Sequence, residues 1–162
     1  MELILLRHGK AEADHPQGDS ARALVDKGRQ QARRAGRLLK AANLTPEIVL
    51  TSPLVRAVQT AEEFCHAAAL PGPVVQGWLA CGCFPETALA ELTAFHEFKR
   101  VAIVGHEPDL SRLIQWCLGA YGDAIEMKKG SLACLRLNLP SRYGTLLYLI
   151  PPKLTKQETE EG

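Results

Sequence analysis

The sequence lacks the features that mark a membrane protein or a nucleic-acid-binding protein. No segment approaches the ~20 apolar residues that cross a membrane. The apolar stretch 3–6 is too short for the core of a signal peptide, and Glu2 stands where such a peptide carries positive charge. The net charge is +1, so no global field draws the chain to nucleic acid or to an anionic membrane. We therefore expect a soluble, cytoplasmic protein with neither of these partners, in which any positive site is local.

Cysteine is sparse, and its spacing matches no common metal or redox motif. The five cysteines are scattered, and the one close pair is Cys81-Gly-Cys83. A structural zinc site commonly has two close pairs of cysteine or histidine ligands, and a redox motif has the spacing CxxC. The pair Cys81 and Cys83 matches neither pattern. We expect buried thiols and one surface turn, and the pattern assigns no role to Cys81 or Cys83.

Length and composition indicate one globular domain. A chain of 162 residues buries about two thirds of the surface that its unfolded form exposes. Apolar residues make up 46% and charged residues 23%, both near the globular average. We expect one domain over residues 1–152, without internal repeats, followed by a polar tail over 153–162 that is frayed.

Runs of apolar residues predict five strands. They lie at 2–6, 47–51, 101–105, 132–138 and 145–150. The segment 71–85 is rich in glycine and proline and predicts an irregular connection, with a short strand at Val74 and Val75.

Helical patterns separate the early strands. Residues 26–42 have one apolar face at helical spacing. A second helix is predicted to start with Ser52 as its N-cap and Pro53 as its first residue, and a third to start near Pro108 and end at Gly119. This alternation predicts an α/β fold: one three-layer α/β/α domain with a mostly parallel central sheet, helices on both faces and an antiparallel edge.

Charged and polar side chains stand where three of these strands end. Arg7 and His8 follow the first strand, His106 follows the third, and Arg56 lies in the first turns of the helix after the second. In such sheets ligands bind beyond the carboxyl ends of the strands, so we expect these four side chains to converge. Two arginines, two histidines and two helix N-termini favour an anion.

The residue types point to phosphoryl chemistry. The planar fork of arginine matches the oxygens of a phosphate, and imidazole acts as a nucleophile or exchanges a proton near neutral pH. Taken singly, each residue is ordinary, because a histidine at a strand end is more often structural and an arginine such as Arg56 more often solvated. No carboxylate or thiol stands at ligand spacing to His8 or His106, so we expect no metal.

Three ordered motifs resemble a known family. Arg7-His8-Gly9 after a buried strand, Ser52-Pro53 with Arg56, and Gly105-His106-Glu107-Pro108 after a central strand are together similar to the histidine phosphatase superfamily. The strings LLRHGKAE, TSPLVRAVQTA and VGHEPDL look most like SixA-type phosphohistidine phosphatases. The resemblance runs from residue 3 to about residue 150 and implies the phosphoglycerate mutase-like fold.

The resemblance implies a role for each motif residue. His8 would be the nucleophile and would carry the phosphoryl group transiently. Arg7, Arg56 and His106 would bind the phosphoryl oxygens and stabilise the charge in the transition state. Water would then hydrolyse the phosphohistidine, so no metal or organic cofactor is implied.

Two further residues take their expected roles from the same resemblance. Gly9 would let the backbone approach closely at the substrate site, and Arg22 would reach the mouth of the pocket and bind substrate. Ala23 and Val25 stand where this group usually has proline and threonine, which alters the loop beside the mouth.

The general acid that larger members of the superfamily use has no matching motif in this sequence. The carboxylates between the second and third motifs are Glu86 and Glu91, and Glu86 is the candidate, although such glutamates ordinarily start helices or lie on the surface. A missing strong acid fits a phosphoramidate, because a P–N bond demands less from an acid than the P–O bond of an alkyl phosphate. His106 or solvent could serve as the acid for an activated ester.

The expected substrate is phosphohistidine on a protein, such as a histidine phosphotransfer protein. The short stretch between Arg56 and His106 leaves little room for the capping insertion of mutases, and an open pocket suits a side chain that protrudes from a partner. Two alternatives stay open: a phosphatase of a small phosphorylated metabolite such as a sugar phosphate, and a phosphate-binding module without activity.

Overall fold

A mixed sheet forms the centre of the protein. A computed structural model describes residues 1–156, and its strands run in the spatial order β3-β2-β4-β1-β5-β6. Their bounds are Glu2–Arg7 (β1), Ile48–Thr51 (β2), Val74–Val75 (β3), Arg100–Gly105 (β4), Leu132–Leu137 (β5) and Gly144–Ile150 (β6). The four strands from β3 to β1 are parallel, whereas β5 is antiparallel to β1 and β6 to β5. The predicted parallel sheet with an antiparallel edge is confirmed.

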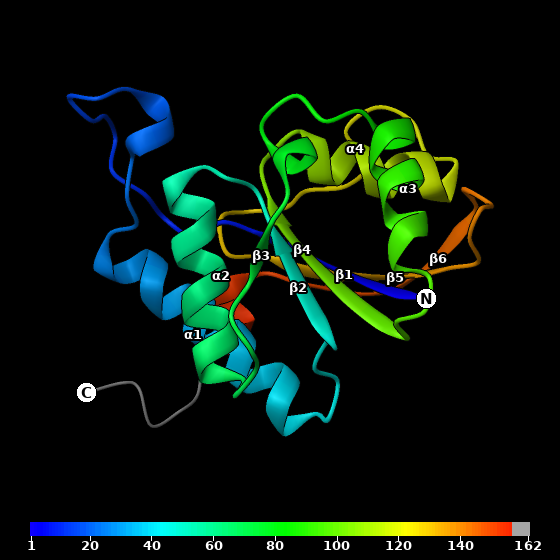
Figure 1. Cartoon of the computed structure of the whole chain (residues 1–162), viewed down its shortest axis with the longest axis horizontal. Coiled ribbons are helices and arrows are strands. Elements are labelled where there is room, and N and C mark those ends of the chain that lie inside the picture. Colours follow the sequence, from blue (N-terminus) through cyan, green and yellow to red (C-terminus); the bar gives the residue numbers. More distant parts are fainter. Residues whose placement is uncertain (157–162) are drawn as a thin grey trace.

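Helices cover both faces of this sheet. They are Asp26–Ala41 (α1), Val55–Ala67 (α2), Pro85–Leu92 (α3) and Asp109–Leu118 (α4), with short 3-10 helices at Asp19–Ala21, Gly77–Leu79, Thr93–Phe95 and Pro152–Thr155. Figure 1 shows α1 and α2 on one side of the sheet and α3 and α4 on the other. The predicted three-layer arrangement is confirmed.

The first strand is apolar without alternation because both of its faces are buried. Leu3 and Leu5 pack with residues of α3 and α4, whereas Ile4 and Leu6 pack with residues of α1 and α2. All four are fully buried, and each such side chain stabilises the fold by about 2 kcal/mol. A strand anchored on two cores holds its carboxyl end, and the residues after it, in a fixed place.

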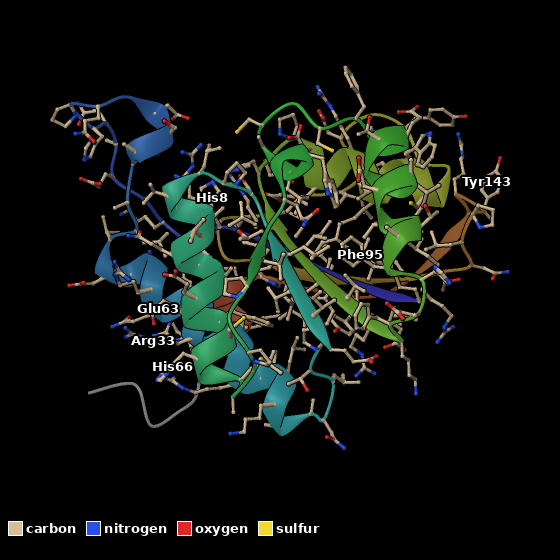
Figure 2. All side chains as sticks on the ribbon, in the orientation of Figure 1. His8, Arg33, Glu63, His66, Phe95 and Tyr143 are labelled. Carbon is tan, nitrogen blue, oxygen red and sulfur yellow. The ribbon has the colours of Figure 1, made fainter. Side chains whose placement is uncertain are left out.

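An ion pair joins the two helices on one face. Glu63 of α2 accepts hydrogen bonds from Arg33 Nε at 2.7 Å and from Arg29 Nη1 at 3.0 Å, both from α1. Figure 2 shows Arg33 and Glu63 next to each other where the two helices pack. The arginines of α1 thus serve helix packing at these positions.

Most of the predicted element boundaries are confirmed, but the predicted start of α2 is wrong. The helix 26–42, the short strand at Val74 and Val75, and the left-handed cap at Gly119 (φ 67°) are confirmed. However, α2 starts at Val55 with Leu54 as its N-cap, and not at Pro53. Ser52 lies two residues before this N-cap, and its hydroxyl accepts from the Leu54 amide at 3.3 Å and also contacts a histidine described below.

The end of the described chain packs against the domain. Residues 152–155 form a 3-10 helix that contacts α1, and Thr155 is buried. The part of the predicted tail from 153 to 155 is therefore ordered and not frayed, and 157–162 lie outside the described residues. Within 1–156 no helix is both long and apolar enough to span a membrane.

Candidate active site

The register of the parallel strands brings two histidines side by side. Arg7 pairs with Gly105 across β1 and β4, and the next backbone amide, that of His8, donates to the Gly105 carbonyl at 3.1 Å. The rings of His8 and His106 consequently lie with their centroids 5.2 Å apart. Figure 2 places His8 near the start of α2, at the end of the sheet where the predicted site residues were expected to meet.

The hydrogen bonding of His8 leaves one ring nitrogen ready to react. His8 is 5% exposed, and its Nδ1 lies 2.8 Å from the Gly9 carbonyl oxygen. A carbonyl only accepts, so Nδ1 carries the hydrogen and Nε2 keeps its lone pair. Burial above all, with smaller contributions from His106 and two arginines, lowers the pKa of His8 from 6.5 to about 3. At neutral pH the imidazole is therefore uncharged and able to act as a nucleophile.

His106 is also buried and neutral. It is 2% exposed, and its Nε2 lies 2.7 Å from the hydroxyl oxygen of Ser52. Burial first, and then the charge of Arg56, lower its pKa from 6.5 to about 4. Ser52 stands at the end of β2, where its amide donates to the Val104 carbonyl at 3.0 Å, so the three strand ends are linked directly.

Both arginines are held from one side by the protein. Arg7 Nη1 donates to the Met127 carbonyl at 2.8 Å, and Arg56, 5% exposed, donates from Nη1 to the Asp19 carbonyl at 2.9 Å. Within residues 1–156, Nε of each arginine and Nδ1 of His106 are buried without a hydrogen-bond partner. Each such group costs about 1–3 kcal/mol, which an anion rich in oxygen acceptors would offset. The polar atoms of the site thus match a phosphoryl group.

Arg22 and Arg56 are connected through a carboxylate that both of them bind. The Asp19 carboxylate accepts from Arg22 Nη1 at 2.9 Å and from Arg56 Nη2 at 3.1 Å, and these bonds hold the pKa of that carboxyl below its usual range. Arg22 Nε donates to the Glu12 carbonyl at 2.6 Å. Sequence reasoning missed Asp19, because nothing in the spacing connects it with an arginine 37 residues later.

Gly9 allows two backbone segments to approach each other. Its amide donates to the Thr60 hydroxyl at 3.1 Å, and that hydroxyl donates to the Arg56 carbonyl at 2.7 Å. A Cβ at position 9 would lie 2.5 Å from the carbonyl oxygen of Gly28, and a Cβ at Gly28 would collide with the backbone of Lys10. The close approach is therefore to the first turns of α1.

The structure places Glu86 on the surface. It lies exposed in the first turn of α3, where glutamate is common. The carboxylate that lines the same hollow as His106 is Asp109, whose Oδ2 accepts from the amides of Gly82 and Cys83 at 2.8 and 3.2 Å. Sequence reasoning missed this residue, although it directly follows the third motif.

The cysteine turn lies at the edge of the site. All five cysteines are free thiols, and Cys81 Sγ lies 3.9 Å from Arg56 Nη2. Burial raises the pKa of the Cys81 and Cys83 thiols, so both are protonated at neutral pH. Among the described residues, no group of three or more His, Cys, Asp or Glu side chains has the geometry to hold a metal.

The buried histidines predict a loss of stability in acid. The unfolded chain protonates a histidine near pH 6.5, whereas folded His8 and His106 do so only near pH 3 and pH 4. The free energy of unfolding should therefore fall below pH 6.5 by up to about 1.4 kcal/mol per pH unit for each histidine. Urea unfolding of the wild type and a His8→Gln variant between about pH 7 and pH 4 tests this, because the variant should show a shallower slope. Equal slopes would contradict the buried, neutral state of His8.

Comparison with known proteins identifies the family. The family model described as the histidine phosphatase superfamily (branch 1) matches residues 3–77. An uncharacterised protein of Picosynechococcus sp. is 34% identical over 148 residues, which cover 84% of this chain and 85% of that protein. A 2,3-bisphosphoglycerate-dependent phosphoglycerate mutase of Leifsonia xyli is 44% identical over 80 residues, but these cover 47% of this chain and only 32% of the mutase.

A solved structure extends the similarity over the whole fold. The protein histidine phosphatase SixA complexed with tungstate superposes with a TM-score of 0.86 at 28% identity, covering 96% of this chain and 100% of SixA. The sequence match and the structural match agree with the resemblance in the three motifs. The chain belongs to the histidine phosphatase superfamily.

Proposed function

We propose that this protein is a phosphatase that takes a phosphoryl group onto His8 Nε2 and passes it to water, with phosphohistidine in proteins as its substrate. The observation that carries the proposal is a buried, uncharged His8 whose Nδ1 is fixed on the Gly9 carbonyl. Beside it are two arginines, each with a buried Nε that has no partner among residues 1–156.

In the first step His8 Nε2 attacks phosphorus, and the bond from phosphorus to the substrate nitrogen breaks. The electron pair of that bond becomes the lone pair of the leaving imidazole, which leaves uncharged when its other ring nitrogen carries a proton. Arg7, Arg56 and His106 bind the phosphoryl oxygens and stabilise the charge that is spread over them in the transition state. A neutral nucleophile is essential here, because a protonated imidazole has no lone pair to donate.

In the second step water attacks the phosphorus of phosphorylated His8. The bond from phosphorus to Nε2 breaks, inorganic phosphate leaves, and His8 returns to its neutral form. The Gly9 carbonyl holds the proton on Nδ1 throughout, which fixes Nε2 as the atom that bonds to phosphorus. The scheme uses no metal and no organic cofactor.

A phosphohistidine substrate is supported by the leaving group and by a relative. An imidazole leaving group needs little help from an acid, and the carboxylate expected to act as the acid, Glu86, is exposed on α3. The similar structure, SixA, is named as a protein histidine phosphatase. A small phosphorylated metabolite is the second candidate, because about half of the chain matches a phosphoglycerate mutase.

A substrate panel tests this proposal. The wild-type protein is offered a phosphohistidine peptide, p-nitrophenyl phosphate and a set of sugar phosphates, and the released phosphate is measured. We expect the highest kcat/KM on the phosphohistidine peptide. Selective turnover of a sugar phosphate would overturn the assignment to protein phosphohistidine, and no release from any substrate would support a binding module without activity.

A further inference from the structure

A groove rich in lysine opens beside the phosphoryl site. Besides Gln31 and Pro152, its lining consists of five cationic side chains, and we call it the basic groove: Arg7, Lys10, Lys27, Lys128 and Lys129. The four lysines are exposed. Arg7 lines this groove and is also part of the proposed phosphoryl site, so the basic groove adjoins that site.

Hydrogen bonds and close packing hold the walls of the basic groove together. Gln31 of α1 is buried, and its Oε1 accepts a hydrogen bond from the Lys10 amide at 2.9 Å. The Gly130 amide donates to the carbonyls of Arg7 and His8, each at 3.1 Å, and a Cβ at Gly130 would lie 2.9 Å from Gln31 Cβ. Segments from three parts of the chain therefore meet around one buried glutamine. The backbone that carries the lysines is held in place by these contacts.

The positive strip continues past this groove. An adjoining hollow shares Lys27, Gln31 and Pro152 with it and adds Lys153 and Lys156 to its lining. Among the described residues, the linings of the two hollows contain no aspartate or glutamate. The whole chain is almost neutral, with 19 basic and 18 acidic residues, so this concentration of one charge is a property of the fold.

We propose that the basic groove docks an acidic protein surface that flanks the phosphohistidine of the substrate; this proposal rests on the proposed function. Lysine is a hydrated point charge on a flexible stem, which suits carboxylates on a surface better than the fixed bidentate geometry of a small ligand. The strip extends over two hollows, whereas a small metabolite would occupy one. Surface charges of this kind speed the association of two proteins and favour partners of opposite charge, and both effects become weaker as salt is added.

Two phosphohistidine peptides test the proposal, one with aspartates and one with serines around the phosphohistidine. At about 20 mM salt we expect the wild type to prefer the acidic peptide about tenfold in kcat/KM, and at about 0.5 M salt the preference should vanish. In the double variant Lys27→Glu/Lys129→Glu the ratio should fall to about one or below. Its matched control, Lys40→Glu/Lys99→Glu, changes the net charge equally on exposed lysines outside the groove and should keep the wild-type ratio.

Direct binding separates this proposal from the proposed function. A fluorescent acidic peptide without phosphate should bind the wild type in a salt-sensitive way and the Lys27→Glu/Lys129→Glu variant about tenfold more weakly. If neither phosphopeptide is hydrolysed but this difference in binding persists, the proposed function fails and the docking surface stands. Equal binding by wild type and variant, an unchanged peptide ratio, or tighter capture of an RNA oligonucleotide than of the acidic peptide would overturn the docking surface.

Discussion

Replacing His8 by alanine is expected to lower kcat on a phosphohistidine peptide by about four orders of magnitude or more. The variant loses the atom that bonds to phosphorus in the proposed scheme. Rapid quenching of the wild type during turnover should trap phosphate that is labile to acid and stable to base, and peptide mapping should place it on His8.

The matched control for this variant is His66→Ala. His66 is exposed at the end of α2 and lies far from His8 in Figure 2, so its loss should leave both turnover and trapped phosphate unchanged. Circular dichroism establishes that each variant is folded. Phosphate release by a folded His8→Ala protein at the wild-type rate, or trapped phosphate on another residue, would refute the assignment of the nucleophile.

Replacing Arg56 by alanine is expected to lower kcat by about two to three orders of magnitude. We propose that the guanidinium binds the phosphoryl oxygens, and because Arg56 is buried its charge acts more strongly there than it would in bulk water. Arg56→Lys should recover only part of the loss, because the single nitrogen of an ammonium cannot take the separate positions from which the guanidinium nitrogens contact Asp19 and would contact the phosphoryl group. Turnover measured for both variants on the same peptide gives the two ratios.

Arg136→Ala serves as the control, since Arg136 is an exposed arginine on β5. It should turn over the peptide at the wild-type rate. A loss in kcat for Arg56→Ala no larger than in this control would show that Arg56 does not stabilise the transition state. A rise in KM with kcat intact would indicate that it binds the ground state and transition state equally.

The positions of the four main site residues could be predicted because local patterns encode them. Unbroken apolar runs revealed the strands, and the rule that ligands bind at carboxyl ends then grouped Arg7, His8, Arg56 and His106. The structure puts Arg7, His8 and His106 at adjacent strand ends and Arg56 in the first turn of α2. Their chemical roles rest on the proposals above and on the variants that test them.

The contacts that orient these residues could not be predicted. Met127 and Asp19 hold the two arginines through contacts between distant parts of the chain, which leave no periodic signal in the sequence. The contact of Ser52 could not be predicted for a related reason: serine before proline is typical of a helix start, and only the fold shows that its hydroxyl pairs with His106. Glu86 is a carboxylate in the expected interval of the sequence, whereas the fold puts Asp109 in the lining of the same hollow as His106.

The bond between Asp19 and Arg56 links the selection of substrates to the support of a buried site residue, two properties that many enzymes can change separately. Asp19 begins the exposed 3-10 helix Asp19–Ala21, in the segment that the sequence predicts to lie beside the mouth of the pocket, yet both its carbonyl and its carboxylate hold the buried Arg56. A mutation that reshapes this loop for another partner therefore also changes the support of that arginine. Lineages of this protein should acquire new substrates through the lysines around the basic groove more readily than through residues 18–22.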